Sequence, residues 1–287
     1  MRVLREPQLG YGLGLTHKYV DAAPFIKWAG GKRKLIPAFA PHFPPMQQVR
    51  RYFEPFLGGG AVFFHLQHPC SFLSDSNEEL IEVYQVVKNN VEDLIQALQK
   101  HRNEETYYYE VRAQDPETLS PVERAARFIF LNKTCYNGLY RVNSEGQFNV
   151  PFGRYRNPLI CDAFGLRAAS LALRNAEIFA ADFEAALANA EHHDFIYCDP
   201  PYHPVSETSS FTAYTADKFD ISDQERLARV YRDLDRRGCY VMLSNSDMPF
   251  IRELYADFQI IEVQAPRAIS SKADGRGKIT ELLIINY

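Results

Sequence analysis

Short apolar runs alternate with longer stretches of helical periodicity along most of this chain. In the second half, runs typical of strands lie at residues 195–198, 240–243, 259–263 and 282–285. Helical patterns at residues 223–236 and 248–255 separate most of these runs. Strands that alternate with helices predict an α/β fold built on a largely parallel sheet.

The first half shows the same alternation. A strand is expected at residues 49–53 and a helix at 61–67, with Gly58-Gly59-Gly60 between them. A second strand at residues 71–73 is closed by Ser74-Asp75, and a helical stretch follows at residues 77–99. These elements extend the prediction to a doubly wound, Rossmann-like domain.

The middle of the chain does not follow this alternation. Residues 101–165 are rich in Tyr, Asn and Arg, with one amphipathic helix expected near residues 121–133 and a hairpin turn at residues 143–146. We interpret this part as an inserted, mainly helical domain. The expected divisions are an irregular leader at 1–20, the α/β domain at 21–80 and 167–287, and the insertion at 81–166.

Composition narrows the possible classes. With 46% hydrophobic and 24% charged residues, the 287-residue chain has the balance of a folded soluble protein. No apolar stretch approaches the roughly 18 residues of a membrane-spanning helix, and no secretory signal is visible. Five scattered cysteines without a CxxC pair, and histidines without ligand spacing, favour a reducing cytoplasm and no metal. The net charge of −4 does not by itself indicate a nucleic-acid partner.

The glycine loop is the first candidate binding site. In doubly wound folds, glycines between a strand and a helix let a nucleotide-like ligand approach the backbone, and an acid after the next strand can bind ribose hydroxyls. Asp75 has that place. The loop departs from the dinucleotide fingerprint because Glu54-Pro55-Phe56 precedes it and no GxGxxG is present. The ligand therefore need not contain a pyrophosphate, and a glycine-rich turn alone is as often only a turn.

The tetrapeptide Asp199-Pro200-Pro201-Tyr202 is the most informative motif. It follows an apolar run, and its prolines would fix a carboxylate and an aromatic ring at the carboxyl end of a strand. An exocyclic amino group of a base is a poor nucleophile, because its lone pair is delocalised into the ring. A carboxylate and a proline carbonyl that accept its two N–H bonds would localise that pair and stabilise the developing positive charge. The alternative is a proline turn with a packed tyrosine.

With these motifs, the sequence resembles the Dam-type family of DNA adenine-N6 methyltransferases from Phe25 to Tyr287. Further matching stretches lie at residues 27–32, 132–155, 211–214, 243–245 and 269–271. Several motifs in the same order are far more specific than any one of them. The resemblance implies S-adenosylmethionine as the methyl donor, double-stranded DNA as the substrate, no metal, and a monomer.

The resemblance also implies a set of cofactor contacts. They are Trp28, Ala29, Gly30, Lys32, Phe56, Gly58, Gly60, Asp75, Asp182 and Asp199. Asp75 would hold the ribose hydroxyls and Asp182 would lie beside the adenine ring. Trp28 could instead be a core aromatic, Lys32 part of a solvated charge run, and Asp182 the cap of the following helix.

The DNA contacts are implied mainly by residues 132–143, where an Asn-Gly turn presents aromatic residues next to an arginine. The candidates are Lys27, Tyr136, Asn137, Leu139, Arg141, Asn143 and Pro151. By the resemblance, Tyr136 inserts into the duplex, while Arg141 and Lys27 contact the two outer guanines of a GATC site. Arginine binds guanine O6 and N7 in a bidentate geometry. The alternatives are ordinary packing for Tyr136 and Leu139, and a surface ion pair for Arg141.

We therefore expect an adenine-specific DNA methyltransferase that acts on a flipped base, with GATC as the target. Two alternatives remain at this point: N4-cytosine methylation by the same tetrapeptide, and a catalytically silent DNA-binding regulator with the same fold. Phosphate contacts could come from arginines and lysines outside the motifs, namely Arg124, Arg127, Arg154, Arg156, Arg267, Lys272, Arg276 and Lys278.

Overall fold

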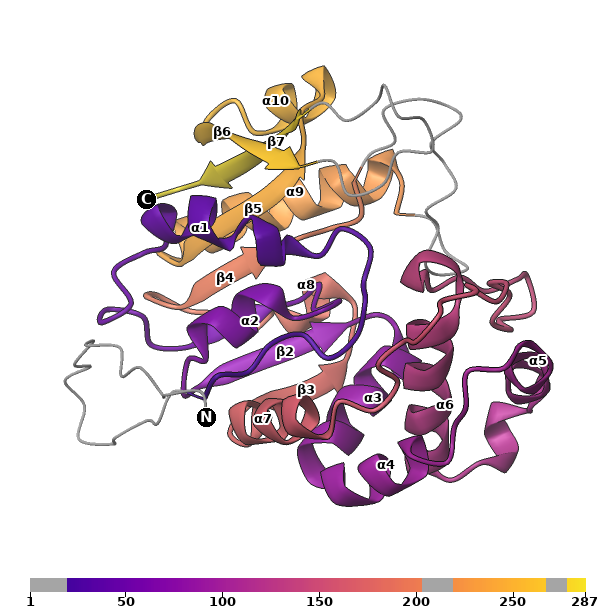
Figure 1. Ribbon diagram of the computed structural model, residues 1–287. Coiled ribbons are helices and arrows are strands. Elements are labelled where there is room, and N and C mark those ends of the chain that lie inside the picture. The colour runs from indigo at the N-terminus through magenta and orange to yellow at the C-terminus, as the bar shows by residue number, and fades with distance from the viewer. Residues whose placement is uncertain (1–19, 203–218, 267–277) are drawn as a thin grey trace.

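The computed structural model describes residues 20–202, 219–266 and 278–287. Its centre is a seven-stranded sheet with the order β3-β2-β1-β4-β5-β7-β6 (Figure 1). All neighbouring strands are parallel except β7, which runs antiparallel to β5 and β6. The strands are β1 (Tyr52–Glu54), β2 (Ser71–Asp75), β3 (Glu177–Ala180), β4 (Phe195–Cys198), β5 (Tyr240–Ser246), β6 (Gln259–Pro266) and β7 (Lys278–Ile285). The predicted doubly wound α/β fold with a largely parallel sheet is confirmed.

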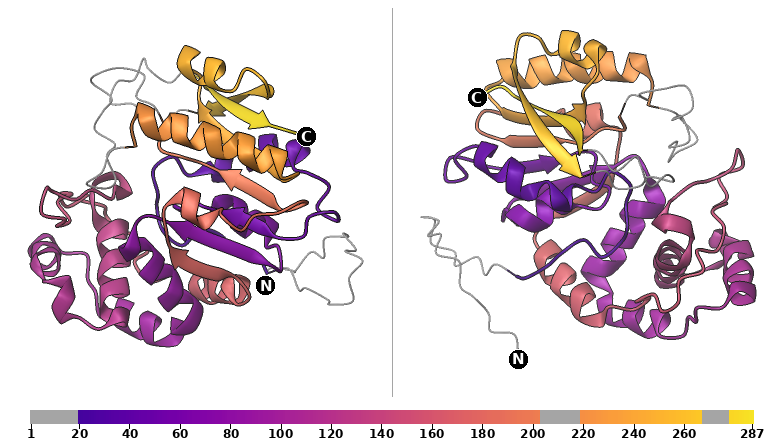
Figure 2. Two further views of the ribbon diagram at one scale, coloured as in Figure 1. Left: turned by 180° about the vertical axis from the view of Figure 1, so that it is seen from behind. Right: turned by 45° about the horizontal axis from the view of Figure 1, so that its top comes forward.

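Helices cover both faces of the sheet (Figure 2). One face packs against α1 (Ile36–Phe39), α2 (Ala61–Leu66), α3 (Glu78–Asn89) and α7 (Ala163–Leu173), and the other against α8 (Phe183–Ala186), α9 (Ile221–Arg236) and α10 (Pro249–Leu254). Successive strand residues enter opposite cores: Tyr197 lies in the first and Cys198 in the second. Because both faces of the central strand β4 are buried, it is apolar throughout rather than alternating.

The chain between β2 and β3 gathers at one end of the sheet (Figure 1). It contains α3, α4 (Val91–Leu98), α5 (Glu105–Ala113), α6 (Pro121–Thr134), α7 and the short 3₁₀ helices Pro116–Thr118 and Tyr136–Gly138. Helix α6 begins with a capping box, in which Ser120 and Glu123 each accept a backbone N–H of the other. The expected hairpin forms, with Val142 bridged to Phe148.

The inserted domain stays a prediction. Its expected boundaries at residues 81 and 166 fall inside α3 and α7. Residues of α3, α4 and α6 share one core with the sheet, and only a smaller cluster around Tyr108, Phe130 and Val150 is separate. The insertion is therefore packed onto the α/β domain rather than held at a distance by a linker.

Several predicted elements differ from the structure in extent. The helical stretch at 77–99 is two helices, because Asn90 leaves helical geometry with φ −133° and ψ 37°. Strand β5 continues to Ser246, because Ser244 and Asn245 pair with Leu283 and Leu282 of β7. The leader at residues 1–19 lies outside the described residues. Within the described ranges, no helix is long and apolar enough to cross a membrane.

Candidate active site

Asp199 follows β4 at the carboxyl end of the parallel strands. Strands β1 and β4 are neighbours from which the chain winds in opposite directions across the sheet, and ligands bind in the crevice at such a switch point. Asp199 Oδ1 lies 2.9 Å from Lys32 Nζ and accepts a 2.8 Å hydrogen bond from Ser244 Oγ. Ser244 is in turn 3.0 Å from the Tyr197 hydroxyl. The predicted catalytic carboxylate is therefore held in one orientation.

Lys32 lies in the centre of this cluster, in the 3₁₀ helix Lys32–Lys34. It is only 3% exposed, and its ammonium donates to the Gly30 carbonyl at 2.6 Å. The same nitrogen lies 4.6 Å from the centroid of the Tyr202 ring. The solvated charge run considered for Lys32 is therefore wrong. This side chain, which is predicted as a cofactor contact, lies against Asp199 and Tyr202 of the predicted catalytic tetrapeptide.

Glu281 was missed by the sequence analysis. It lies on β7, accepts a 2.8 Å hydrogen bond from the Tyr202 hydroxyl, and has a carboxylate oxygen 4.0 Å from Lys32 Nζ. Burial raises the pKa of Glu281, and Lys32 and the Tyr202 hydroxyl act against that increase. The available signal was a single acidic residue inside an apolar strand, because a buried carboxylate needs partners.

The backbone of the tetrapeptide is held from the other side of the sheet. Gln224 of α9 donates to the Pro201 carbonyl at 3.0 Å, and Asn245 donates to Gln224 at 3.1 Å. Both amides are fully buried. Pro200 is also buried, which fixes the loop without a side-chain hydrogen bond. Gln224 belongs to no sequence motif, so the sequence alone does not indicate this role.

The glycine loop connects β1 to α2 in a conformation that requires glycine. Gly58 has φ +46° and Gly60 has φ +65°. A Cβ on Gly58 would lie 2.6 Å from the indole of Trp28, and one on Gly60 would lie 2.9 Å from the Tyr84 hydroxyl. That hydroxyl donates to the Gly58 carbonyl at 3.0 Å. Both positions therefore require glycine, because φ is positive and Trp28 and Tyr84 approach the loop closely.

Asp75 completes this loop from the end of β2. Its Oδ2 accepts the Gly58 N–H and its Oδ1 accepts the Asn77 N–H, each at 3.0 Å. Burial raises the pKa of Asp75, while these backbone hydrogen bonds lower it. Each carboxylate oxygen retains acceptor capacity for a ligand hydroxyl. The residues present therefore fit the ribose of S-adenosylmethionine.

Glu54 is a second buried carboxyl group that the sequence analysis did not select. It lies at the end of β1 and accepts hydrogen bonds from the Tyr52 hydroxyl at 2.7 Å and the Phe63 N–H at 3.0 Å. Burial raises its pKa to about 8. Because Phe63 lies in the first turn of α2, Glu54 fixes the helix onto which the glycine loop opens.

Asp182 and Phe56 are occupied by other contacts. Asp182 caps α8 through the Glu184 N–H at 3.0 Å, and Arg226 of α9 contacts both of its carboxylate oxygens at 2.8 Å. Partial burial acts to raise the pKa of Asp182, but Arg226 and the backbone N–H groups lower it overall. Phe56 stacks on Phe183 at 5.4 Å. The capping interpretation of Asp182 is confirmed, and any cofactor contact would have to share the carboxylate with Arg226.

The candidate DNA-binding residues lie beside the segment that carries Trp28 and Lys32. Asn132 of α6 accepts the Lys27 N–H at 2.8 Å and donates to the Lys27 carbonyl at 2.7 Å and the Gly138 carbonyl at 3.3 Å. One buried amide thus joins Lys27 to the Asn-Gly turn. Asn137 has φ +56° there, and Tyr136 is 54% exposed. Packing in a core is therefore wrong for Tyr136.

The hairpin beyond this turn is stabilised from within. Arg141 donates to the Asn149 side chain at 2.6 Å and to its backbone carbonyl at 3.3 Å, so these hydrogen bonds, rather than the surface ion pair considered as an alternative, hold its side chain. Asn143 Oδ1 accepts the N–H groups of the turn at Glu145 and Gln147. The remaining two candidates have simple roles: Leu139 packs against the small core, and the Pro151 carbonyl accepts the Tyr136 N–H.

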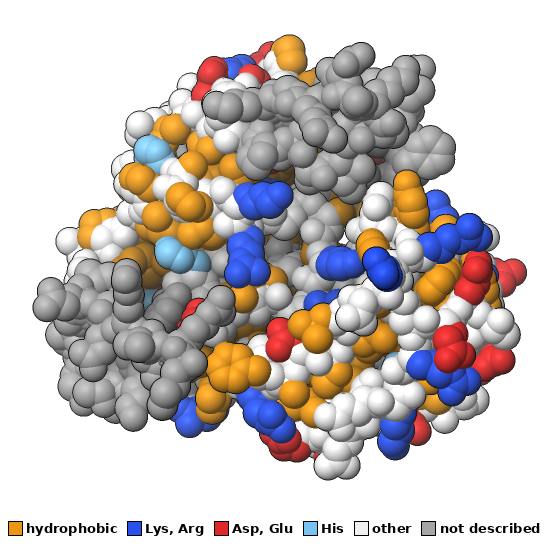
Figure 3. Space-filling view, viewed as in Figure 1, with side chains coloured by type: hydrophobic (Ala, Val, Ile, Leu, Met, Phe, Trp, Pro, Cys, Tyr) orange, Lys and Arg blue, Asp and Glu red, His pale blue; other side chains and the backbone are white. Residues whose placement is uncertain are grey.

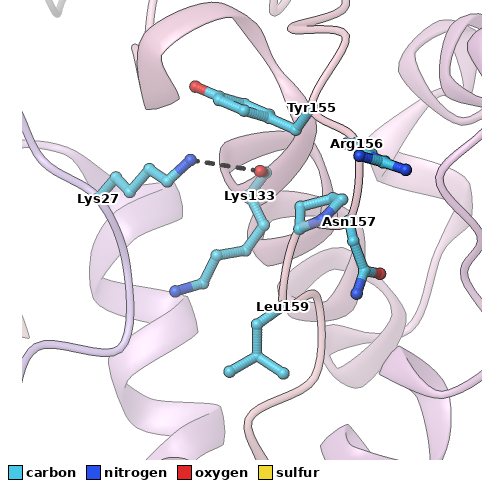
Figure 4. A pocket seen from close by; sticks show the side chains of 7 residues that line it. Lys27, Lys133, Tyr155, Arg156, Asn157 and Leu159 are labelled. Carbon is cyan, nitrogen blue, oxygen red and sulfur yellow. Dashed lines mark hydrogen bonds between the residues drawn. The ribbon is translucent and has the colours of Figure 1, made fainter.

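A basic pocket of about 340 Å³ lies next to Lys27 (Figure 4). Lys27 donates to the Lys133 carbonyl at 3.4 Å and lies 4.1 Å from the centroid of Tyr155. The lining residues are Lys27, Lys133, Tyr155, Arg156, Asn157, Pro158 and Leu159. On the face shown in Figure 3, Lys and Arg side chains gather around a hollow near the middle. The charge is thus distributed as an anionic partner requires, despite the net charge of −4.

Two of the proposed phosphate contacts already have protein partners. Arg124 forms a bidentate pair with Glu82, and Arg127 is buried and donates to the carbonyls of Val111 and Arg112. These interactions favour a structural role for both. Arg154 is exposed, while the motif at 211–214 and the residues Arg267, Lys272 and Arg276 lie outside the described residues. Among the described residues, no cluster of side chains could hold a metal ion.

The doubly wound fold and the residues around Asp75 and Asp199 fit a methyltransferase that uses S-adenosylmethionine. A family model described as D12 class N6 adenine-specific DNA methyltransferase matches residues 28–269, and the chain belongs to this family. This chain is 45% identical, over 95% of its length, to the type II methyltransferase M1.LlaDCHI of Lactococcus lactis subsp. cremoris, and it covers 98% of that protein.

Two further relatives agree with this assignment. The type II methyltransferase M.MjaIII of Methanocaldococcus jannaschii is 45% identical over 93% of this chain and is covered completely. The DNA adenine methylase of Escherichia coli K12 is 37% identical over 91% of this chain, which covers 94% of it. The chain is thus an adenine-specific DNA methyltransferase, and the alternatives of cytosine methylation and a silent regulator are not supported.

Proposed function

We propose that the enzyme methylates N6 of an adenine that has been flipped out of double-stranded DNA, within the sequence GATC. The observation that carries this proposal is the set of hydrogen bonds made by Asn132. They join the turn that exposes Tyr136 to Lys27, five residues before Lys32. Lys32 in turn pairs with Asp199. The residues proposed for target recognition are thereby connected to those proposed for chemistry. Flipping is required because N6 cannot reach a catalytic group from inside the base stack.

In the proposed reaction, the Asp199 carboxylate and the Pro200 carbonyl accept the two N–H bonds of the adenine amino group, while the Tyr202 ring stacks on the base. S-adenosylmethionine supplies an electrophilic methyl group on its sulfonium when bound. The N6 lone pair forms the new C–N bond as the methyl–sulfur bond breaks, and one N6 proton then leaves. No covalent enzyme intermediate is needed, so catalysis comes from positioning and electrostatic stabilisation.

Cofactor binding is assigned to the glycine loop and its surroundings. Asp75 would hold the ribose hydroxyls, with Gly58, Gly60, Trp28, Ala29 and Gly30 around the cofactor. Asp182 and Phe56 would flank the adenine ring. The hydrogen bond from the Gly58 N–H to the Asp75 carboxylate supports this assignment, because it holds the loop and the acid in a fixed relative position before a ligand binds.

Target recognition is assigned to the turn and hairpin. Arg141 and Lys27 would contact the outer guanines, and Tyr136 would fill the space that the flipped base leaves. Asn137, Leu139, Asn143 and Pro151 would shape the surface near the central bases. The choice of GATC depends on the resemblance of residues 132–155 to the corresponding segment of family members that recognise GATC.

The test incubates unmethylated plasmid with the enzyme and methyl-labelled S-adenosylmethionine. The product is analysed as nucleosides and by digestion with GATC-cutting nucleases of opposite methylation dependence. Label in N6-methyladenine together with GATC protection is expected. Label in adenine without GATC protection would overturn the target, and absence of label despite DNA and cofactor binding would overturn the activity.

Base flipping is tested separately with 2-aminopurine in place of the target adenine. Its fluorescence is quenched by stacking, so an increase on enzyme binding is expected. The matched control carries 2-aminopurine at a flanking position. An equal increase at both positions would contradict selective flipping.

A further inference from the structure

The proposed reaction assigns no role to the buried ammonium group of Lys32. Lys32 lies 2.9 Å from Asp199, so its positive charge is placed where positive charge would develop on N6 during methyl transfer. An ammonium group there opposes the reaction unless another negative charge compensates for it. Glu281 is positioned to do this, with its carboxylate 4.0 Å from Lys32 Nζ.

Glu281 also acts on the aromatic ring of the motif. It accepts the Tyr202 hydroxyl at 2.8 Å, while the Lys32 ammonium lies 4.6 Å from the centroid of the same ring. The side chain of Glu281 is 16% exposed and that of Lys32 is 4% exposed, so solvent screens this cluster little. Strand pairing fixes its position, because Glu281 lies opposite Ser246 of β5 and Val263 of β6.

We propose that Glu281 is a positioning residue for methyl transfer, which orients Tyr202 and keeps the cluster with Lys32 and Asp199 at a net negative charge. The inference rests on the proposed function of Asp199 and Tyr202. With Glu281 ionised, two carboxylates face one ammonium and the sum is −1. Without it, Lys32 neutralises Asp199, and the stabilisation of the developing positive charge weakens.

The experiment measures the single-turnover rate of methyl transfer at saturating enzyme, together with the dissociation constants for S-adenosylmethionine and DNA. Glu281→Gln retains the size of the side chain but removes its charge. We expect its rate to fall about tenfold or more, with both dissociation constants within about threefold of wild type. An unchanged rate in an active preparation overturns the inference but leaves the proposed function intact, whereas an inactive wild type overturns the proposed function itself.

Two variants separate charge from hydrogen bonding. Tyr202→Phe removes the hydroxyl and leaves the charge of Glu281 in place. Glu281→Asp keeps the charge on a shorter side chain. If charge matters, Glu281→Asp is faster than Glu281→Gln; if both Glu281 variants are equally slow, the charge part of the proposal is wrong. If Tyr202→Phe and Glu281→Gln have equal rates, the charge part of the proposal is also wrong, and Glu281 acts only as the hydrogen-bond acceptor of Tyr202.

A double variant and a matched control complete the design. Lys32→Met combined with Glu281→Gln restores a net charge of −1, so it is expected to be no slower than Glu281→Gln alone. If the loss of rate in the double variant equals the product of the losses in Lys32→Met and Glu281→Gln, charge compensation is contradicted. Glu262→Gln alters an exposed carboxylate on the neighbouring strand β6 and is expected to leave the rate unchanged. Thermal unfolding of every variant identifies losses due to misfolding.

Discussion

The proposed catalytic cluster and the proposed recognition segment are built in different ways. Around Asp199, side chains from distant parts of the chain meet in a largely buried cluster: Lys32, Tyr202, Ser244 and Glu281. The proposed recognition segment at residues 136–151 combines local contacts, such as those of Arg141 with Asn149, with contacts to the helices, such as the hydrogen bond from Tyr140 to Glu79. It also exposes a large aromatic side chain, Tyr136.

This difference follows from what each region must do. Stabilising charge in a transition state requires groups that are oriented before the reaction, and burial strengthens their effect. Reading a base requires groups that protrude and can adjust to the groove. Four predictions test this contrast: the first three are in order of expected effect, and the fourth concerns pH.

The largest effect is expected at Asp199. Asp199→Ala should reduce methyl transfer on the order of a thousandfold or more, because the acceptor for an N6–H bond and the local negative charge are both lost. The measurement is the single-turnover rate, with cofactor binding expected to stay within about tenfold of wild type. Near-normal turnover would show that the buried cluster is structural, and the contrast between the regions would disappear.

Arg141 is expected to affect discrimination rather than chemistry. Arg141→Ala should cost about 1–3 kcal/mol at one base pair, because a bidentate contact to guanine is lost. The measurement compares kcat/KM on GATC with that on sites substituted at each outer base pair. Arg154→Ala, which alters an exposed arginine proposed as a phosphate contact, is the control and should weaken binding uniformly. Uniform weakening by Arg141→Ala as well would make it a phosphate contact.

Asn132 links the two regions, so its loss should reduce stability. Asn132→Ala leaves the Lys27 N–H and two carbonyls without their partner, and an unsatisfied buried group costs about 1–3 kcal/mol. Denaturant unfolding measures this change in the free energy of unfolding. Asn143→Ala, which acts in an exposed turn, should cost less. Equal costs for the two would show that the junction is no more ordered than the hairpin.

The fourth prediction concerns the pH dependence of stability and the buried carboxyl group of Glu54. Its folded-state pKa of about 8 lies above the ordinary 4.5, so the folded state binds the proton more tightly than the unfolded chain. Its contribution therefore favours folding below 4.5 and is lost progressively as pH rises to about 8. The free energy of unfolding should decline less between these values in Glu54→Gln than in wild type. Parallel pH profiles would contradict the raised pKa.

Local signals predicted much of this molecule. Helix α6 forms as expected because Ser120, Pro121 and Glu123 supply its cap at the start. The hairpin forms because Asn143 and Gly146 suit its turn. Strand β4 matches its apolar run at residues 195–198, since both faces of that strand are buried. Predictions failed where neighbours decided the outcome, as in the extension of β5 by pairing with β7.

The candidate site divides along the same line. The sequence by itself determined the motifs and their order: the glycine loop, Asp75, Asp199-Pro200-Pro201-Tyr202 and the Asn-Gly turn are short segments whose chemistry is local. Only the tertiary structure decided that Lys32 lies against Asp199 and that Glu281 faces both Lys32 and Tyr202. It also decided that Arg226 forms an ion pair with Asp182. These contacts join residues far apart in the chain, and sheet pairing and helix packing, rather than any local pattern, set their distances.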